Sequence, residues 1–366
     1  MSLPFRPPVE PMLAKLTNEV PAGDHWIFEP KWDGFRAMVF RDGDDVFIQS
    51  RDLKPLQRYF PELLGPLKHS LPERCVLDGE IVIATSGKLD FESLLLRIHP
   101  AESRVKMLSE TTPASYVAFD VLAIGDEDLR NTPQKERRAR LEAALANCKA
   151  PVVLTPATRD HATAVDWFTR FEGAGLDGVV AKAEDLVYSP GKRTMIKVKH
   201  ARTVDCVVAG FRWFKGFRGT LVGSLLLGLF DAEGSLHHVG ICASFKREVR
   251  AQLAKDLEPL REGARESHPW GQFVPPAEAR PAEGEGEAAP QRKPGGQSRW
   301  SRGKDLSWEP LRCERVCEVA FDHMQGKRFR HATHLKRWRP DKAPTDCSYA
   351  QLEVTPAIEI SKIFGT

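Results

Sequence analysis

The 366-residue chain lacks the GxxxxGK[ST] sequence of a phosphate-binding loop, which excludes a P-loop as its means of holding nucleotides. It also lacks long apolar runs. Stretches such as SLLLGLF are too short to cross a bilayer, and the N-terminal MSLPFRPPVEPMLAK has no apolar signal core. We therefore expect no membrane partner and a cytoplasmic location.

Cysteine is sparse and follows no framework. The seven cysteines are scattered and odd in number, which favours reduced thiols over disulfides. Cys313 and Cys317 are spaced C-x3-C, but no second pair follows at the spacing of a zinc finger. The sequence therefore gives little support to a structural zinc site.

The formal net charge is only +3, but the basic residues are clustered. Segment 192–202 (KRTMIKVKHAR) has five Lys or Arg and no acid, and segment 327–342 has seven against one Asp. Segment 211–219 (FRWFKGFRG) interleaves three basic residues with four aromatics. One such run is typical of a solvated face. Three of them together predict a polyanionic partner.

Turn signals and apolar periodicity divide the chain into two parts. Helices are expected at 57–71, 132–148 and 164–175, and strands within 26–52 and at 75–84, 115–124, 176–183 and 195–201. From residue 203 onward, several strands and one helix suit a small barrel such as an OB fold. Segment 276–298 is rich in Pro, Glu, Gly and Ala, and predicts a mobile surface insertion. The fold class is therefore α+β, with domains at 1–202 and 203–366.

The stretch FEPKWDGFRA sets Lys31 between a proline and a Trp-Asp-Gly turn. The plain interpretation is a surface loop, and the alternative is a nucleophile that attacks phosphorus. Such a lysine must lose its proton, and its target needs cations to neutralise the phosphate charge. The chain offers carboxylates and cations near predicted strand ends: Glu29, Asp78, Glu80 and Asp177, with Arg36, Arg51, Lys197 and Lys199. Each is weak evidence alone, so their order and spacing carry the argument.

That ordered set resembles the nucleotidyltransferase superfamily of ATP-dependent DNA ligases and mRNA-capping enzymes. The matching motifs are KWDG (31–34), Ser50-Arg51, LDGEIV (77–82), YVAFDVL (116–122), DGVVAK (177–182), IKVK (196–199) and RWRPDK (337–342). The stretch PPVEPMLAK, with EPKWDGFRA and SRDLK after it, is similar to the small bacterial DNA ligase C group. The resemblance implies a nucleotidyltransferase (adenylation) domain with antiparallel sheets and flanking helices, followed by an OB-fold β-barrel domain.

The resemblance also implies roles for the matching residues. Lys31 carries AMP, Glu29 helps read adenine, Phe119 stacks on it, and Arg36 and Glu80 contact ribose or the nick phosphate. Arg51, Lys197 and Lys199 bind phosphate; Asp78, Glu80 and Asp177 hold or organise a metal; Arg339, Asp341 and Lys342 act on the departing pyrophosphate. The family usually has Glu where Asp177 stands, so that carboxylate reaches a metal less directly. Arg202, Arg212, Lys215 and Arg218 are expected to grip DNA.

The resulting hypothesis is a monomeric, ATP-dependent enzyme that seals nicks in duplex DNA through a lysyl-AMP intermediate. It requires Mg²⁺ or Mn²⁺ and serves DNA repair at the nucleoid. An RNA ligase or mRNA-capping enzyme is the alternative within the same fold, and the choice between ATP and GTP separates the two. An inert nucleic-acid-binding scaffold is the third interpretation, which the intact set of Lys31, Glu80, Lys197 and Lys199 disfavours.

Overall fold

The computed structural model describes residues 2–85, 87–170, 176–199, 202–273, 294 and 305–352. The chain divides into two compact units, and among the described residues the first lies within 2–199 and the second within 202–352. The insertion expected at 276–298 lies outside the described residues, apart from Pro294. No helix among the described residues is both long enough and apolar enough to span a membrane.

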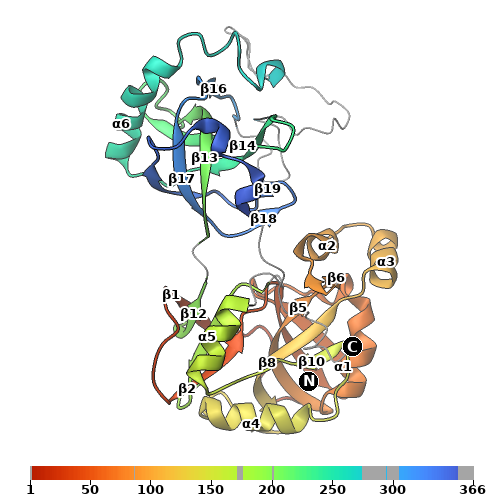
Figure 1. Ribbon diagram of the computed structural model, residues 1–366. Coiled ribbons are helices and arrows are strands. Elements are labelled where there is room, and N and C mark those ends of the chain that lie inside the picture. The colour runs from red at the N-terminus through yellow and green to blue at the C-terminus, as the bar shows by residue number, and fades with distance from the viewer. Residues whose placement is uncertain are drawn as a thin grey trace. The chain divides into compact units, whose positions relative to one another are not determined.

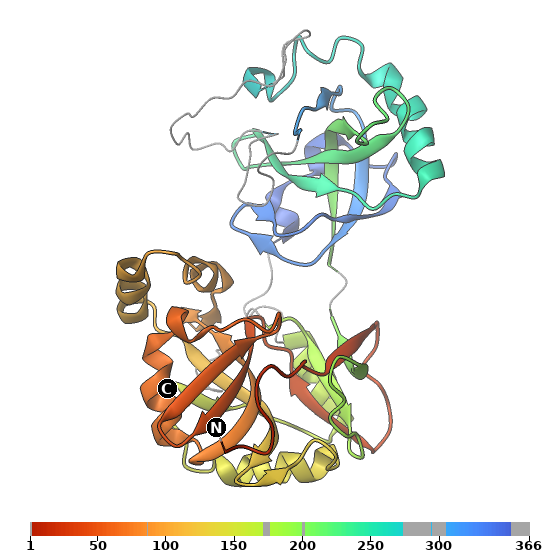
Figure 2. The same ribbon diagram turned by 180° about the vertical axis from the view of Figure 1, so that it is seen from behind.

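The first unit contains two main sheets, shown in Figures 1 and 2. The larger runs in the order β10-β8-β5-β3-β4, with β9 paired to β8, and the smaller in the order β1-β12-β11-β2. Most neighbours are antiparallel, but β10 with β8 and β1 with β12 are parallel. The strand bounds are β1 Leu13–Thr17, β2 Trp26–Pro30, β3 Phe35–Asp42, β4 Asp45–Ser50, β5 Arg74–Val82, β6 Ala84–Thr85, β7 Lys88–Leu89, β8 Ser115–Ile124, β9 Glu127–Asp128, β10 Val152–Leu154, β11 Val179–Ala183 and β12 Arg193–Val198.

Five α-helices are described in the first unit: α1 Pro61–Ser70, α2 Phe91–Leu96, α3 Glu102–Thr111, α4 Gln134–Ala144 and α5 His161–Arg170. Helix α1 begins at Pro61, where a missing amide hydrogen costs nothing, and buries Leu63 and Leu67, one turn apart. Helix α4 packs on β8, and α5 packs on β2 and β11 of the smaller sheet (Figure 1). The main core of this unit lies between α1, α4 and the larger sheet.

Helix α4 was expected over 132–148 with Thr132 as its N-cap. It instead begins at Gln134, with Pro133 in the capping position, and ends at Ala144. Helices α2 and α3 were not expected. The first has only six residues and the second buries only Val105, so neither leaves a clear apolar period.

The second unit is built on one sheet in the order β15-β14-β13-β17-β20, with β16 paired to β13. Its described elements are β13 Arg202–Trp213, β14 Val222–Phe230, β15 Leu236–Cys242, β16 Glu309–Pro310, β17 Val316–Phe321, β18 Met324–Gln325, β19 Arg328–Phe329, β20 His334–Trp338 and α6 Arg247–Leu257. Helix α6 lies against β14 (Figure 2, teal). The expected α+β class with antiparallel sheets is confirmed.

The described strands do not close into the expected barrel. The edge strands β15 and β20 are linked at only one point, an isolated bridge between Cys242 and Thr333 just before β20 begins. The five residues of β20 pair with β17, and among the described residues no ladder longer than that bridge joins this end of the chain to β15.

Candidate active site

The turn that carries Lys31 is fixed in place by two of the residues that follow it, Trp32 and Gly34. The Trp32 indole is buried and donates a hydrogen bond to the Thr155 hydroxyl at 2.9 Å. Gly34 lies so close to β5 that a Cβ there would meet the Ile81 carbonyl oxygen at 2.2 Å. The Trp-Asp-Gly run therefore anchors Lys31 against the sheet, which is more than a surface turn requires.

Lys31 and Asp177 are joined through both backbone and side chain. The amide of Lys31 donates to the Gly178 carbonyl at 2.8 Å, and the amide of Asp177 donates to the Lys31 carbonyl at 2.9 Å. The Lys31 ammonium forms an ion pair with the Asp177 carboxylate, and Lys199 pairs with the same oxygen at 2.7 Å. Gly178 has φ of 126°, and a Cβ there would meet the Val198 carbonyl oxygen at 2.0 Å. The Asp-Gly turn is thus needed for this close approach.

Cations outnumber carboxylates around Asp177. Lys199, Lys31 and Arg51 lie near Lys197, and their positive charges, together with burial, lower the pKa of Lys197. Lys31 and Lys199 are partly exposed, with side-chain accessibilities of 19% and 23%. A site with surplus positive charge and partial access suits a phosphate chain. The structure therefore places Lys31, Asp177, Lys197, Lys199 and Arg51 near one another.

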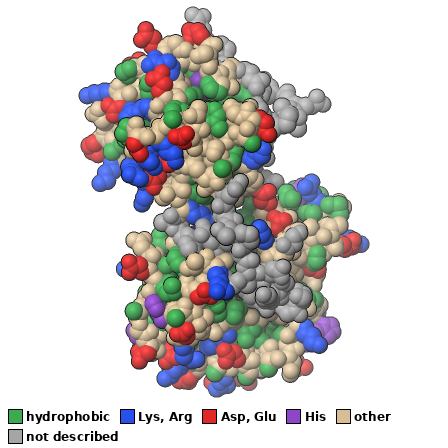
Figure 3. Space-filling view, in the orientation of Figure 1, with side chains coloured by type: hydrophobic (Ala, Val, Ile, Leu, Met, Phe, Trp, Pro, Cys, Tyr) green, Lys and Arg blue, Asp and Glu red, His purple; other side chains and the backbone are tan. Residues whose placement is uncertain are grey.

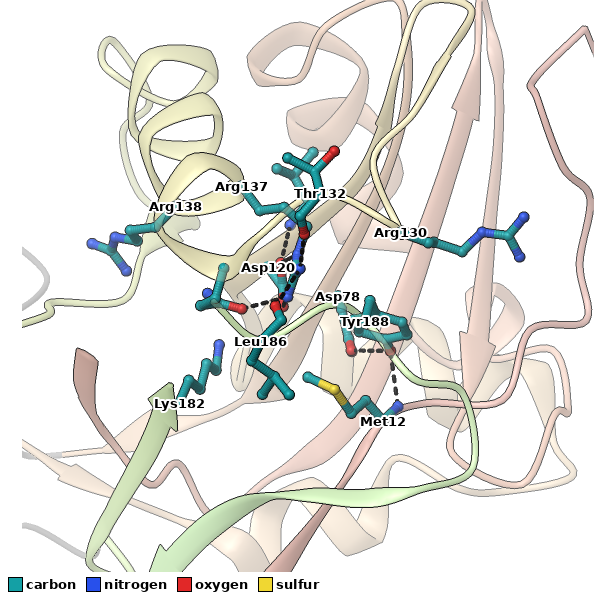
Figure 4. Close-up of polar contacts among 12 residues, drawn as sticks. Met12, Asp78, Asp120, Arg130, Thr132, Arg137, Arg138, Lys182, Leu186 and Tyr188 are labelled. Carbon is teal, nitrogen blue, oxygen red and sulfur yellow. Dashed lines mark hydrogen bonds and ion pairs between the residues drawn. The ribbon is translucent and has the colours of Figure 1, made fainter. Parts of the chain in front are cut away.

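Asp78 is fully buried and occupied on both oxygens. It accepts hydrogen bonds from Arg36 at 2.9 and 2.5 Å and from the Tyr188 hydroxyl at 2.6 Å. Tyr188 in turn accepts from the amide of Met12 at 3.0 Å, as Figure 4 shows. Burial and the Asp78 charge raise the pKa of Tyr188 well above its usual range, which keeps the hydroxyl a donor. Asp78 thereby orients Arg36, a role that the sequence did not reveal.

The Phe119 ring is near two cationic side chains, those of Arg36 and Lys182. The Arg36 guanidinium is 5.1 Å from the centre of its ring, and the Lys182 ammonium is 5.0 Å from it. The ring is half-buried rather than enclosed in the core. This placement is compatible with an aromatic platform for a nucleobase.

Glu29 is buried on β2 and paired with two cations that the sequence analysis missed. Its carboxylate is 2.9 Å from the Lys182 ammonium on β11 and 3.4 Å from the Arg138 guanidinium on α4. Val180 pairs with Glu29 across the two strands, and Lys182 lies two residues further along β11, in the motif DGVVAK. Residues two apart on a strand share a face, so Lys182 faces the same side of the sheet as Glu29. That alternation was the available signal for Lys182; no comparable signal marks Arg138.

Glu80 lies opposite Arg36 on the neighbouring strand of the larger sheet. Burial raises its pKa to about 7, and the charges of Lys31 and Arg36 limit the rise. Glu80 is therefore close to the Lys31 amine, and its pKa lies nearer neutral pH than that of an ordinary glutamate.

Carboxylates near Lys31 are the candidate ligands for a metal. In the described part of the chain, no three His, Cys, Asp or Glu side chains form a group that could hold an ion. Asp78 accepts hydrogen bonds on both oxygens, and Glu80 and Asp177 are further carboxylates near Lys31. Mg²⁺ at nucleotide sites is commonly held by one or two carboxylates together with phosphate oxygens. This donor set fits a metal that arrives with its nucleotide.

In the second unit, the motif RWRPDK is held by Asp205 of β13. Arg339 pairs with Asp205 at 3.0 Å and with Asp341 at 2.8 Å, and Lys342 pairs with Asp205 at 2.8 Å. Asp205 is buried, whereas Asp341 is largely exposed. The structure thus places Arg339 and Lys342 side by side on Asp205, a residue that the sequence analysis did not identify.

The residues expected to grip DNA differ in exposure. Lys215 is exposed, and Arg218 is exposed while pairing with Glu309 at 3.0 Å. Arg212 is partly buried, and its Nε atom is buried without a hydrogen-bond partner. Arg202 contacts the His323 ring at 3.4 Å. The surface of this unit in Figure 3 carries Lys and Arg side chains with Asp and Glu among them.

Comparisons with known proteins show the family to which the chain belongs. Residues 11–199 match the ATP dependent DNA ligase domain, and residues 218–342 match the ATP dependent DNA ligase C terminal region. The chain is 52% identical to DNA ligase C2 of Mycolicibacterium smegmatis over 356 residues, 97% of each chain. It is 50% identical to DNA ligase C of Mycobacterium tuberculosis over 367 residues, 99% of each.

A solved structure of the Lig E DNA ligases has a TM-score of 0.52 at 15% identity, covering 90% of this chain and 99% of that one. At this identity the likeness concerns the fold alone.

Proposed function

Because the chain belongs to the family of ATP-dependent DNA ligases, we propose that it joins DNA ends through AMP carried on Lys31. The observation that carries this proposal is the position of Lys31. Its amine lies beside Asp177, with Lys199 on the same carboxylate and Lys197 close by. An amine among surplus cations is placed to attack a phosphate whose charge those cations neutralise.

Three transfers follow from one site. The Lys31 nitrogen attacks the α-phosphorus of ATP, a nitrogen–phosphorus bond forms, and the bond to pyrophosphate breaks. AMP then passes to the 5′-phosphate of a nick, and Lys31 is released. Finally the 3′-hydroxyl attacks that phosphate, AMP leaves and the backbone is sealed. Each step places charge on non-bridging oxygens, so Lys197, Lys199 and Arg51 serve all three.

The other residues position the nucleotide and its metal. We assign adenine to Glu29 and Phe119, and the ribose or nick phosphate to Arg36, which Asp78 holds in place. Asp177 and Glu80 are the residues that we expect to hold Mg²⁺ or Mn²⁺, and such an ion supplies further neutralisation of phosphate charge. Asp78 also belongs to the expected metal-binding set, and its bonds to Arg36 orient that guanidinium.

We assign Arg339, Asp341 and Lys342 to the pyrophosphate that leaves in the first step, and Lys215 and Arg218 to DNA. The first unit is then the adenylation domain and the second the OB-type domain, with the boundary near residue 202. We propose a monomer that acts on nicked duplex DNA during repair. Its location at the nucleoid in the cytoplasm follows from that substrate.

The test is transfer of label from ATP to protein. Wild-type protein incubated with α-labelled ATP and divalent metal is expected to yield a covalent protein band, which GTP does not give. Lys31→Ala should bind ATP with little change and form no band. A labelled band in this variant would show that another group carries AMP.

A further inference from the structure

Glu29 occupies an unusual electrostatic position for a base-reading residue. Its side chain is only 3% exposed, and a buried carboxylate is costly unless it is paired. Lys182 lies 2.9 Å from one oxygen and Arg138 lies 3.4 Å from the other, so each oxygen has its own cation. Both cations are themselves buried, with exposures of 1% and 6%.

Lys182 connects the two parts of the site that we assign to adenine. Its ammonium donates to the Phe119 carbonyl oxygen at 2.8 Å, lies 5.0 Å from the centre of the Phe119 ring, and pairs with Glu29. One side chain on β11 therefore fixes the carboxylate at the edge of the base relative to the ring at its face.

The Arg138 side chain is also held in place by residues other than Glu29. Its three nitrogens donate to three acceptors: Glu142 at 2.6 Å, the Thr155 carbonyl at 2.9 Å and Glu29 at 3.4 Å. Figure 4 shows Arg138 projecting from α4 and Lys182 from β11. Because the two cations come from different elements, they hold the carboxylate from two directions.

We propose that Lys182 and Arg138 are positioning residues that make the enzyme select ATP over GTP, acting through Glu29. This inference rests on the proposed role of Glu29. An ionised carboxylate can only accept hydrogen bonds. At the corresponding edge position, adenine presents the N6 amino donor, whereas guanine presents the O6 acceptor. A carboxylate held in its charged form by two cations thus binds adenine and repels guanine.

The same geometry explains why pairing does not block recognition. Each carboxylate oxygen has two lone-pair directions, and the cations occupy one on each oxygen. The remaining directions are available to an amino group. Loss of either cation leaves a buried carboxylate with half its compensation, which favours a displaced Glu29 that no longer distinguishes the two purines.

The experiment compares kcat/KM for self-nucleotidylation with ATP and with GTP. Lys182→Met is expected to raise KM for ATP tenfold or more, with a smaller change in kcat, and to lower the preference for ATP at least tenfold. Arg138→Gln should act in the same direction and serves as the second variant if Lys182→Met does not fold. Glu142→Ala is the matched control, because it removes the outer bond of Arg138 and leaves the bond to Glu29.

A double-mutant cycle separates positioning from a merely structural role. In the Glu29→Gln background, Lys182→Met should have no further effect on the ratio of ATP to GTP use. A structural role instead lowers use of both nucleotides equally and leaves the ratio unchanged, which would overturn the inference.

Failure of the proposed function has a different signature. If Glu29→Gln keeps the full preference for ATP, Glu29 does not read the base, and the assignment of that residue is wrong. If Glu29→Gln relaxes the preference but Lys182→Met and Arg138→Gln do not, only the positioning inference fails.

Discussion

Arg339 and Asp205 lie 134 residues apart in sequence, and their side chains meet at 3.0 Å on both carboxylate oxygens. Lys342 reaches one of the same oxygens at 2.8 Å. Asp205 is buried and fixes the two cations as a pair. Asp341 contacts Arg339 as well, through a second ion pair. A pair of cations held at a fixed separation suits a diphosphate, whose charge is spread over two phosphorus centres.

The first prediction is that this pair acts in one step only. Lys342→Ala should slow formation of enzyme-AMP from ATP by roughly 100-fold, because charge develops on the leaving pyrophosphate in that step. The same variant should still seal a nick that already carries 5′-linked AMP, since no pyrophosphate remains. Gel assays of protein labelling and of sealing measure the two steps separately.

Asp205→Asn extends this test to the residue that holds the pair. It keeps the shape of the side chain and removes its charge, so adenylylation should fall by about tenfold with sealing of the pre-adenylylated nick retained. If both activities fall together in either variant, these residues act on DNA or on folding, and the step-specific assignment is wrong.

The second prediction concerns Glu80 and pH. Its pKa is raised from an ordinary 4.5 to about 7, so the folded state holds a proton that the unfolded state releases between those values. The stabilisation linked to this proton is complete below pH 4.5 and is lost as pH rises to 7. Relative to Glu80→Gln, the wild type should lose up to about 3 kcal/mol of unfolding free energy over this range.

Urea unfolding of both proteins, without nucleotide or divalent metal, measures that difference at several pH values. The difference should change between pH 4.5 and 7 and stay constant above about 7.5. A difference that does not vary with pH would mean that Glu80 titrates as an ordinary glutamate.

The residues at the centre of the candidate site could be singled out from the sequence because they lie in short motifs. Lys31, Asp177 and Lys199 belong to three such motifs, and in the structure the two lysines pair with the Asp177 carboxylate. Strand β8 was expected at 115–124 and spans Ser115–Ile124, since a largely apolar run between turn signals, interrupted only by Asp120, is a strong pattern.

The supporting layer could not be predicted in the same way. Tyr188 meets Asp78 from 110 residues away, and Arg138 meets Glu29 from 109 residues away. Neither pair leaves a local pattern, because a buried contact between distant segments depends on the completed fold. The prediction of a closed barrel was wrong for a related reason. Closure depends on where the last strand begins and ends, and the ends of an element are the part that local sequence indicates least well.

The last prediction concerns the grip on DNA. Segment 214–218 exposes Lys215 and Arg218 beside two partly exposed rings, Phe214 and Phe217. These rings are held from below by cations of α6: Arg250 lies 4.6 Å from Phe214, and Arg247 lies 5.1 Å from Phe217. A loop with a braced aromatic base and two outward cations is suited to phosphate contacts that do not read sequence.

Replacing both outward cations, Lys215→Ala with Arg218→Ala, should weaken binding to nicked duplex DNA and leave self-adenylylation largely intact. Two lost phosphate contacts should reduce the slope of log K against log salt by about 2. The charge-matched control is Lys255→Ala with Arg140→Ala, which removes two exposed cations outside the segment and should keep the slope. Binding isotherms at four salt concentrations decide the matter. An unchanged slope in the first double variant would place the DNA-binding surface elsewhere. An equal fall of the slope in both double variants would mean that only the net charge of the protein matters.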